Sequence, residues 1–236
     1  MAYRFQTESI KTSYLRFYFM KPSRYSSSGA VCLIAALLSF PVYAEDSNSL
    51  GYTKIANDGS ELDASAKLGD GASEWACTRD NNTGLTWEIK TAGGLRDMKH
   101  TYTWYNTDPD INGGNAGFFG KNTCGGTLPA FKNRCNTAYY VAAINAAALC
   151  GYTDWRLPEH EELKPLVAST IPGNQTTVDP AYFPNTPSPF YWTLTAVAGI
   201  YLDTWYVNEG EKGKGGVCGG NMKEGTYSVR LVRGGK

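Results

Sequence analysis

Apolar and polar residues alternate over Gly84–Lys90, and the residues just before this stretch, Asp80–Gly84, have the composition of a turn. Alternation places successive side chains on opposite faces of a strand, so the pattern predicts a half-buried strand after a turn. Three later stretches rich in aromatic and β-branched residues predict further strands: Phe190–Thr195, Tyr201–Val207 and Tyr227–Val232.

A helical spacing of apolar residues begins at Thr137 and runs to Leu149, with Val141 and Ile144 on the apolar stripe. Thr137 is a suitable N-cap, because its hydroxyl can accept a backbone N–H of the first turn. Gly151 follows the stretch, where a left-handed C-terminal cap favours glycine. The pattern therefore predicts a helix over residues 137–149.

A second helix is predicted to begin after Pro158, since proline is tolerated in the first turn. Glu159 and Glu161 would lie near its N-terminus, where the helix dipole favours negative charge. Leu163 and Leu166 would form its buried face. Two helices, several antiparallel strands and much loop together predict an α+β fold.

The N-terminal part has the layout of a secretory signal peptide. The apolar run Val31–Phe40 follows Lys21 and Arg24, and the small-residue site Val42–Ala44 comes after it. We expect cleavage after residue 44, with Met20 as the true start. No later apolar run is long enough to span a membrane, so no transmembrane segment is expected in residues 45–236.

The remaining chain divides by composition. Residues 45–74 are polar and predict a spacer with an edge strand near Gly51–Ile55, and residues 75–236 form the main domain. Within it, residues 91–136 are a long irregular region rich in Gly, Asn and Thr, which in a compact domain is usually functional. Asn208–Gly225 is predicted to be a Gly- and Lys-rich loop.

Residues 45–236 carry a net charge of −4, because removing five basic residues and one acidic residue from 22 of each leaves 17 and 21. This balance argues against a nucleic-acid partner, which requires a basic surface.

Five cysteines follow the predicted cleavage site, and an exported protein is expected to form disulfides. Cys124 and Cys135 close a short loop and are the first expected pair, and Cys77 with Cys150 is the second. Cys218 would then be left over. The chain has only two histidines and no Cys-x-x-Cys pair, which argues against a zinc site.

Asp108, Asp110, Asn112 and Gly113 match the first half of a calcium loop, with oxygen ligands at alternate positions before a turn glycine. Phe119 stands where the bidentate glutamate of such a loop would lie. The alternative is an Asn- and Gly-rich turn. Ca²⁺ is the one cofactor that the sequence indicates.

Ligand-binding candidates come from aromatic and basic residues. Trp104 and Tyr105 lie in the irregular region and are expected to be exposed, where sugar rings can stack on them. Lys212, Lys214 and Lys223 form a basic loop that can contact acidic glycans, with a solvated loop as the alternative. The remaining tryptophans of the domain's predicted elements are expected in the core: Trp87, Trp155 and Trp192.

The stretch GYTDWRLPEHEEL at residues 151–163 concentrates charged and aromatic residues. A zinc-binding helix is not indicated, because Lys164 stands where the second histidine after His160 would be. We interpret the stretch as structural: Trp155 and Leu157 point inward, and Arg156 is paired with an acid. The structural residues are Asp154, Trp155, Arg156, Pro158 and Glu162. The acid paired with Arg156 is expected to be Asp154, Glu162 or Asp179.

Several stretches in order resemble the Lcl C-terminal domain family over roughly residues 75–235. They are CTRDNNTGLTWE at 77–88, CNT at 135–137, LCGYTDWRLP at 149–158, EL at 162–163, YFPNT at 182–186, YWT at 191–193 and VRLVRGG at 229–235. The resemblance implies a C-type-lectin-like core related to formylglycine-generating enzymes. The family's best-known member is a bacterial collagen-like adhesin whose terminal domain trimerises and binds sulfated glycans. This chain lacks a Gly-X-Y stretch, so collagen-driven trimerisation is not carried over.

The resemblance and the residues together predict an exported, non-enzymatic recognition module that binds a glycan or a surface protein and is periplasmic, cell-surface or extracellular. An oligomer is compatible with this reading. Two alternatives are an enzyme of unknown reaction on the lectin-like core and an assembly subunit of a surface appendage.

Overall fold

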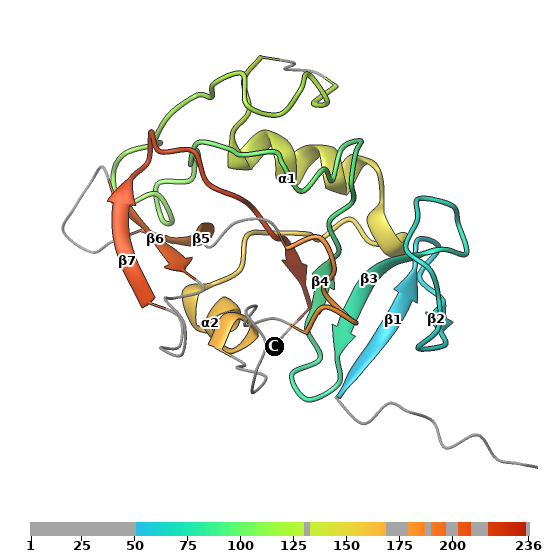
Figure 1. Ribbon diagram of the computed structural model, residues 1–236. Helices are drawn as coiled ribbons and strands as arrows, with labels where there is room; N and C mark the ends of the chain where they lie inside the picture. Colours follow the sequence, from blue (N-terminus) through green and yellow to red (C-terminus); the bar gives the residue numbers. More distant parts are fainter. Residues whose placement is uncertain are drawn as a thin grey trace, which may run out of the picture. The chain divides into compact units, whose positions relative to one another are not determined.

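A computed structural model describes residues 51–129, 133–168, 179–186, 190–196, 203–208 and 217–234 (Figure 1). The predicted signal peptide at residues 1–44 lies outside these ranges. Within them, no helix is long and apolar enough to cross a membrane. Two helices and antiparallel sheets confirm the α+β class, and the lectin-like core stays a prediction.

The larger sheet has five antiparallel strands in the order β2-β1-β3-β4-β8. They are β1 (Tyr52–Ala56), β2 (Glu61–Leu62), β3 (Trp75–Asp80), β4 (Thr86–Glu88) and β8 (Val232–Arg233). The strand expected near residues 51–55 is present as β1, but it lies inside the sheet. The short strand β2 covers its outer side through the pair Lys54–Leu62, so part of the predicted spacer belongs to the sheet.

A second sheet has three antiparallel strands, β5 (Phe190–Ala196), β6 (Asp203–Asn208) and β7 (Val217–Met222). The prediction of one loop over Asn208–Gly225 was wrong where β7 stands. Glycine-rich β7 carries no alternating pattern of its own, and it becomes a strand by pairing with β6, Cys218 opposite Val207.

The predicted strand at Tyr227–Val232 is mostly irregular. Tyr227 and Ser228 make single bridges to Tyr102 and Tyr191, and regular pairing is confined to β8. The segment is nevertheless buried, because these bridges place it between the two sheets.

The helix α1 (Thr137–Ala146) begins where the sequence predicts and ends earlier. Asn136 is its N-cap and accepts the backbone N–H of Tyr139, so the prediction of Thr137 as the cap was wrong by one residue. The chain leaves the helix at Ala148, whose φ of 49° is left-handed, and continues as a 3-10 turn, η1 (Leu149–Gly151). Gly151 therefore ends this turn and not α1.

The helix α2 (His160–Ala168) follows Pro158 as predicted. The carboxylate of Glu162 accepts the backbone N–H of Glu159 at 2.8 Å, which satisfies one of the free N–H groups at the start of the helix. Leu163 and Leu166 are buried in one core cluster with Trp87 and Val232 of the larger sheet. Figure 1 shows α2 between the two sheets.

Two disulfides confirm both predicted pairs. Cys77–Cys150 fastens β3 to η1 across 73 residues of sequence, and Cys124–Cys135 closes a loop of 11 residues within the irregular region. The backbone of Cys218 lies in β7, and its side chain is outside the described part of the structure.

Candidate functional site

The GYTDWRLPEHEEL stretch forms a junction between η1, α2 and the last strand. Trp155 and Leu157 are buried, and Trp155 donates its indole N–H to the Leu149 carbonyl oxygen at 3.0 Å. Arg156 makes two hydrogen bonds of 2.7 Å to the Glu162 carboxylate. Glu162 is therefore the partner that the sequence left open among three acids. Arg156 is only partly buried. The contacts of the stretch join η1, α2 and the last strand, which is a structural role.

Asp154 pairs with a different arginine. Its carboxylate accepts two hydrogen bonds from Arg233, at 2.8 and 3.0 Å, and these bonds hold the pKa of Asp154 below its ordinary value. The Arg233 guanidinium also lies 3.8 Å from the centre of the Tyr152 ring. The C-terminal strand is thus fastened to the junction by a side-chain pair that sequence reasoning did not predict.

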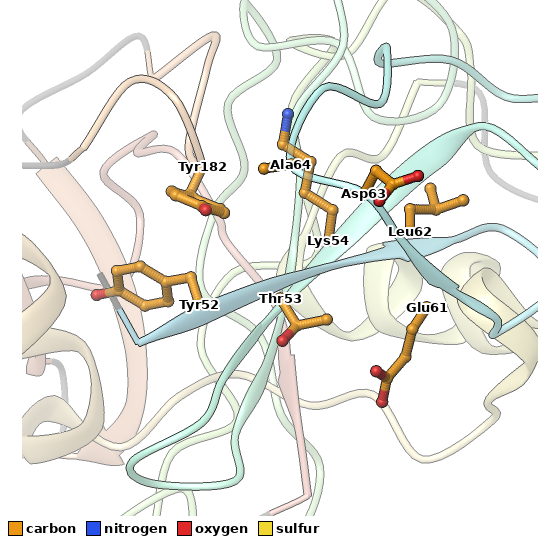
Figure 2. Close-up of a pocket in the computed structure, with 8 residues that line it drawn as sticks. All are labelled: Tyr52, Thr53, Lys54, Glu61, Leu62, Asp63, Ala64 and Tyr182. Atoms are coloured by element: carbon orange, nitrogen blue, oxygen red, sulfur yellow. The ribbon is translucent and has the colours of Figure 1, made fainter. Parts of the chain in front are cut away.

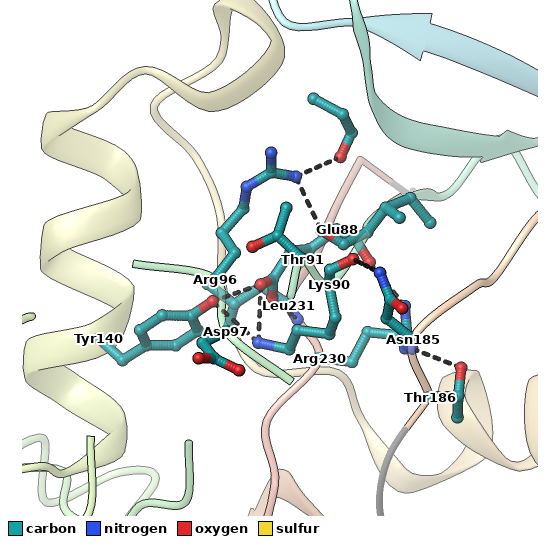
Figure 3. Close-up of polar contacts among 12 residues, drawn as sticks. Glu88, Lys90, Thr91, Arg96, Asp97, Tyr140, Asn185, Thr186, Arg230 and Leu231 are labelled. Carbon is teal, nitrogen blue, oxygen red and sulfur yellow. Dashed lines mark hydrogen bonds and ion pairs between the residues drawn. The ribbon is translucent and has the colours of Figure 1, made fainter. Parts of the chain in front are cut away.

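A buried ionic network around Glu88 joins β4, α1 and the C-terminal segment (Figure 3). Its carboxylate accepts hydrogen bonds from the Tyr140 hydroxyl, from Lys90 at 2.7 Å and from the backbone N–H of Leu231 at 2.9 Å. Arg230 donates to the backbone oxygen of Glu88 at 2.8 Å. These hydrogen bonds replace the contacts with water that the polar groups lose on burial.

Burial is the largest influence on Lys90 and lowers its pKa to about 8, while the neighbouring Glu88 acts in the opposite direction. Burial also raises the pKa of the Tyr140 hydroxyl well above its ordinary value. Glu88 and Tyr140 are fully buried and Lys90 is 3% exposed, so a ligand cannot reach these groups in this conformation. The network joins elements of the fold. It contains no accessible acid or base that would support the alternative of an enzyme.

Trp104 is not a surface residue, and the expectation of its exposure was wrong. Its side chain is 0% exposed and donates its indole N–H to the Thr193 carbonyl oxygen at 2.9 Å. Neighbouring side chains of an extended segment point to opposite sides, and this segment pairs at Thr103 and Tyr105. Trp104 therefore faces the core with Tyr102, while Tyr105 faces outward and is half-buried.

The predicted calcium loop is held by an internal cation. Lys223, which was predicted to belong to the basic loop that contacts glycans, is instead buried, so that prediction was wrong for this residue. It donates to the backbone oxygens of Asn112 and Asn115, both at 2.7 Å, and its ammonium lies 4.5 Å from the centre of the Trp104 ring. The Asp108 carboxylate accepts the backbone N–H of Asp110 at 3.0 Å.

The side-chain oxygen of Asn112 is also engaged within the loop, where it accepts the backbone N–H of Gly114 at 2.8 Å. These contacts fit the alternative of an Asn- and Gly-rich turn. In the part of the chain that the structure describes, no group of three or more His, Cys, Asp or Glu side chains is placed to hold a metal ion. Calcium binding by Asp108, Asp110 and Asn112 stays a prediction.

Lys212 and Lys214 lie outside the described residues, so their predicted role in ligand binding stays a prediction.

An aromatic patch, made of Tyr105, Phe119 and Tyr139, lies where the irregular region meets α1, and Phe118 precedes Phe119 in the chain. The Phe119 ring makes edge contacts with Tyr105 and Tyr139, with 5.4 Å between ring centres in each pair. The Arg134 guanidinium lies 4.7 Å from the centre of the Phe119 ring. Phe118 is 43% and Phe119 40% exposed, two of the three large apolar side chains described as exposed.

The backbone that carries the patch is firmly held. Thr103 donates to the carbonyl oxygen of Phe118 at 2.8 Å, and Asn136 donates to that of Phe119 at 2.9 Å. Gly117 has a φ of +86°, and a Cβ atom there would lie 2.3 Å from the Trp104 carbonyl oxygen. A glycine is therefore required at 117 for the loop to approach the core segment. The phenyl rings are exposed on a fixed support.

Sequence reasoning named Tyr105 as a ligand-binding candidate, which stays a prediction, and it did not name Phe119 or Tyr139 as candidates. The adjacent pair Phe118-Phe119 in a Gly- and Asn-rich region was the available signal, because two large apolar residues rarely stand together in a solvated loop. Tyr139 gave no such signal, since an aromatic residue on α1 fits core packing equally well. Partial burial, with Tyr105 nearby, raises the pKa of the Tyr139 hydroxyl, and Arg134 acts against this change.

The family model of the Lcl C-terminal domain matches residues 76–233 of the chain. The comparisons with curated proteins and with solved structures gave no match. The matched range includes the junction, the Glu88 network and the aromatic patch.

Proposed function

Because the chain belongs to the Lcl C-terminal domain family, we propose that it is an exported, adhesin-like recognition module that binds an acidic glycan through the aromatic patch. The two disulfides fit an oxidising compartment outside the cytoplasm. The observation that carries the proposal is the exposure of Phe119 beside Arg134.

The chemistry of the patch suits this class of ligand. An aromatic ring packs against the C–H face of a sugar, and its electron-rich surface makes the contact favourable. The Arg134 guanidinium presents several N–H donors that match a carboxylate or sulfate group. The hydroxyl groups of Tyr105 and Tyr139 add polar contacts at the rim. The patch thus combines apolar stacking with one cation, despite the net charge of −4 over residues 45–236.

A surface protein is the second candidate ligand. Phenylalanine has no polar edge, and exposed apolar side chains next to an arginine are also typical of protein interfaces. The exposure of both Phe118 and Phe119 favours this candidate.

A glycan array with the oxidised protein tests the proposal. We expect Phe119→Ser to weaken binding to acidic glycans about tenfold, since loss of an aromatic anchor commonly costs more than 1 kcal/mol. Met222→Ser is the matched control, because Met222 is 56% exposed and lies on β7 outside the patch. Equal losses in both variants, or glycan binding that Phe119→Ser leaves unchanged, would contradict the patch as the binding site. Running the array with Ca²⁺ and with chelator tests the calcium prediction separately.

A further inference from the structure

A hollow of about 170 Å³ lies beside the C-terminal end of α1 and shares no residue with the aromatic patch. Ile144 of α1 and Leu149 of η1 are at most 4% exposed, so they form a fixed part of its lining. Leu95 and Ala147 add further apolar surface. The Cys77–Cys150 disulfide fastens η1 directly next to Leu149. The hollow therefore offers a small apolar surface that exists before a ligand binds.

Arg96 brings a positive charge to this hollow, although the residue is only 4% exposed. Its Nη1 donates to the carbonyl oxygens of Ala76 and Ile89 at 3.0 and 2.7 Å (Figure 3). Its Nη2 donates to the carbonyl oxygen of Gly69 at 3.3 Å and to the carboxylate of Asp70. The three backbone oxygens hold the guanidinium in place.

The edge of the guanidinium formed by Nε and Nη2 is only partly used. Nη2 contacts Asp70, whereas Nε of Arg96 makes no hydrogen bond to any of the described residues. Two N–H groups on one edge match the two oxygens of a carboxylate. The Asp70 side chain also lines the hollow and is 74% exposed. Because an exposed carboxylate is held weakly, a ligand carboxylate can replace it and bind both N–H groups.

The interior behind Arg96 has more positive than negative groups. Lys90, Arg96 and Arg230 are all buried, and Glu88 carries the one buried carboxylate among the described residues. Burial lowers the pKa of Lys90 to about 8, Glu88 opposes this change, and Arg230 and Arg96 lower the pKa further. A carboxylate inside the hollow would be screened by water less than that of Asp70, so it would balance these cations better.

We propose that this hollow binds a small carboxylic acid with a short apolar chain. The ligand carboxylate takes the place of Asp70 on Nε and Nη2 of Arg96, and its chain packs on Ile144 and Leu149. Pockets for drug-sized ligands usually measure about 300–1,000 Å³, so a hollow of about 170 Å³ fits a smaller molecule. Asp70 acts as an internal competitor that covers Arg96 in the absence of ligand. The site does not depend on the glycan proposal.

Titration of the purified protein, with both disulfides formed, tests this proposal. Butyrate is the probe, and butyramide and butylamine are the matched neutral and cationic molecules. We expect butyrate to shift the NMR signal of the Ile144 methyl groups and to bind about tenfold more tightly than butyramide, because only the acid forms paired charge-assisted bonds with Arg96. Butylamine should bind more weakly than either.

A first variant tests the role of the internal competitor. Asp70→Asn should strengthen butyrate binding about threefold, because it removes the charge that competes for Arg96. Asp63→Asn is the matched control and should bind butyrate as the parent does. Asp63 is also exposed, but it lines a different hollow, which lies between β1 and Tyr182 (Figure 2).

A second variant tests the apolar part without changing any charge. Ala147→Leu should fill part of the hollow and weaken butyrate binding about tenfold. Ala146→Leu is its matched control, because Ala146 is exposed at the end of the same helix and does not line the hollow. Melting temperature checks that each variant is folded.

Three results would overturn the proposal: equal affinity for butyrate and butyramide, unchanged or weaker butyrate binding in a folded Asp70→Asn protein, and equal effects of Ala147→Leu and Ala146→Leu. The last comparison holds even if Asp70→Asn fails to fold. Tighter binding of acetyl-Ala-Leu than of butyrate would also overturn it, since the ligand would then be a protein C-terminus. Phe119→Ser should leave the titration unchanged, which separates this test from that of the patch.

Discussion

The larger sheet with α2 and the irregular region with α1 differ in which side chains they bury and which they expose. Around the sheet, charged groups are buried and paired, as in the Glu88–Lys90 contact and in Arg230. In the irregular region the backbone is fixed, yet phenyl rings are exposed at Phe118 and Phe119. The buried, paired charges stabilise the fold, whereas the exposed phenyl rings are unfavourable in contact with water. An exposed apolar surface is therefore where a binding function is expected.

The largest effect is expected in the sheet region from Glu88→Gln. The change leaves the Lys90 ammonium buried without its counter-charge, which typically costs about 3–5 kcal/mol. Urea unfolding should show this loss, whereas Glu224→Gln at an exposed position should change stability by less than about 0.5 kcal/mol. A Glu88→Gln protein as stable as the parent would show that the network does not hold the two elements together.

The two disulfides separate the regions further. In the chain-entropy description, the 73-residue span of Cys77–Cys150 contributes about 4.4 kcal/mol and the 11-residue span of Cys124–Cys135 about 2.8 kcal/mol. We expect the double serine variant of the first pair to lower stability more, and that of the second to lower glycan binding more. Thermal unfolding and the glycan array measure the two effects. If loss of the second pair lowered stability more and loss of the first lowered glycan binding more, the two regions would not divide stability and binding in this way.

Arg156→Ala should give an intermediate loss of about 1.5–3 kcal/mol, because it removes two charge-assisted hydrogen bonds to Glu162. Arg156→Lys should restore only part of it, since an ammonium group cannot form the paired bonds. Yield of secreted protein and melting temperature are the measurements. If the variant were secreted and had a normal melting temperature but did not bind, the junction would have a role in binding and not in folding.

The smallest stability change is expected in the patch. Phe119→Ser replaces a ring that is 40% exposed, and surface substitutions usually change stability by about 0.5 kcal/mol or less. Gly117→Ala is the sharper comparison within the same region. It should lower stability through backbone strain at a φ of +86° and so affect binding indirectly. If Phe119→Ser unfolded the protein, the patch would be part of the core.

Much of the fold followed from local pattern. The strand at β4, the start of α1, the start of α2 after Pro158 and both disulfides agree with the sequence prediction. Periodicity and capping act over a few residues, so they are visible in the chain itself. The strand β7 was missed because its glycine-rich sequence has no such pattern, and only pairing with β6 makes it a strand.

The candidate site was predicted only in part, for a reason that Trp104 and Tyr105 illustrate. The sequence marks both as aromatic residues in a loop, but it does not state which side of an extended segment faces the core. The bridges at Thr103 and Tyr105 decide this, and they bury Trp104 while Tyr105 stays half-buried beside Phe119. The junction shows the same limit, since three acids were possible partners of Arg156 and packing selected Glu162.

The sequence by itself determined the α+β class and the family resemblance, because each depends on residue types in a fixed order. It predicted the two cysteine pairs, and the structure decided between them and the other possible pairings. Tertiary structure alone decided that Phe119 and Tyr139 meet Tyr105 on one surface. Those residues are distant in the chain and carry no common pattern. Their proximity results from long-range strand pairing and helix packing, which set the distances between side chains that local propensity does not encode.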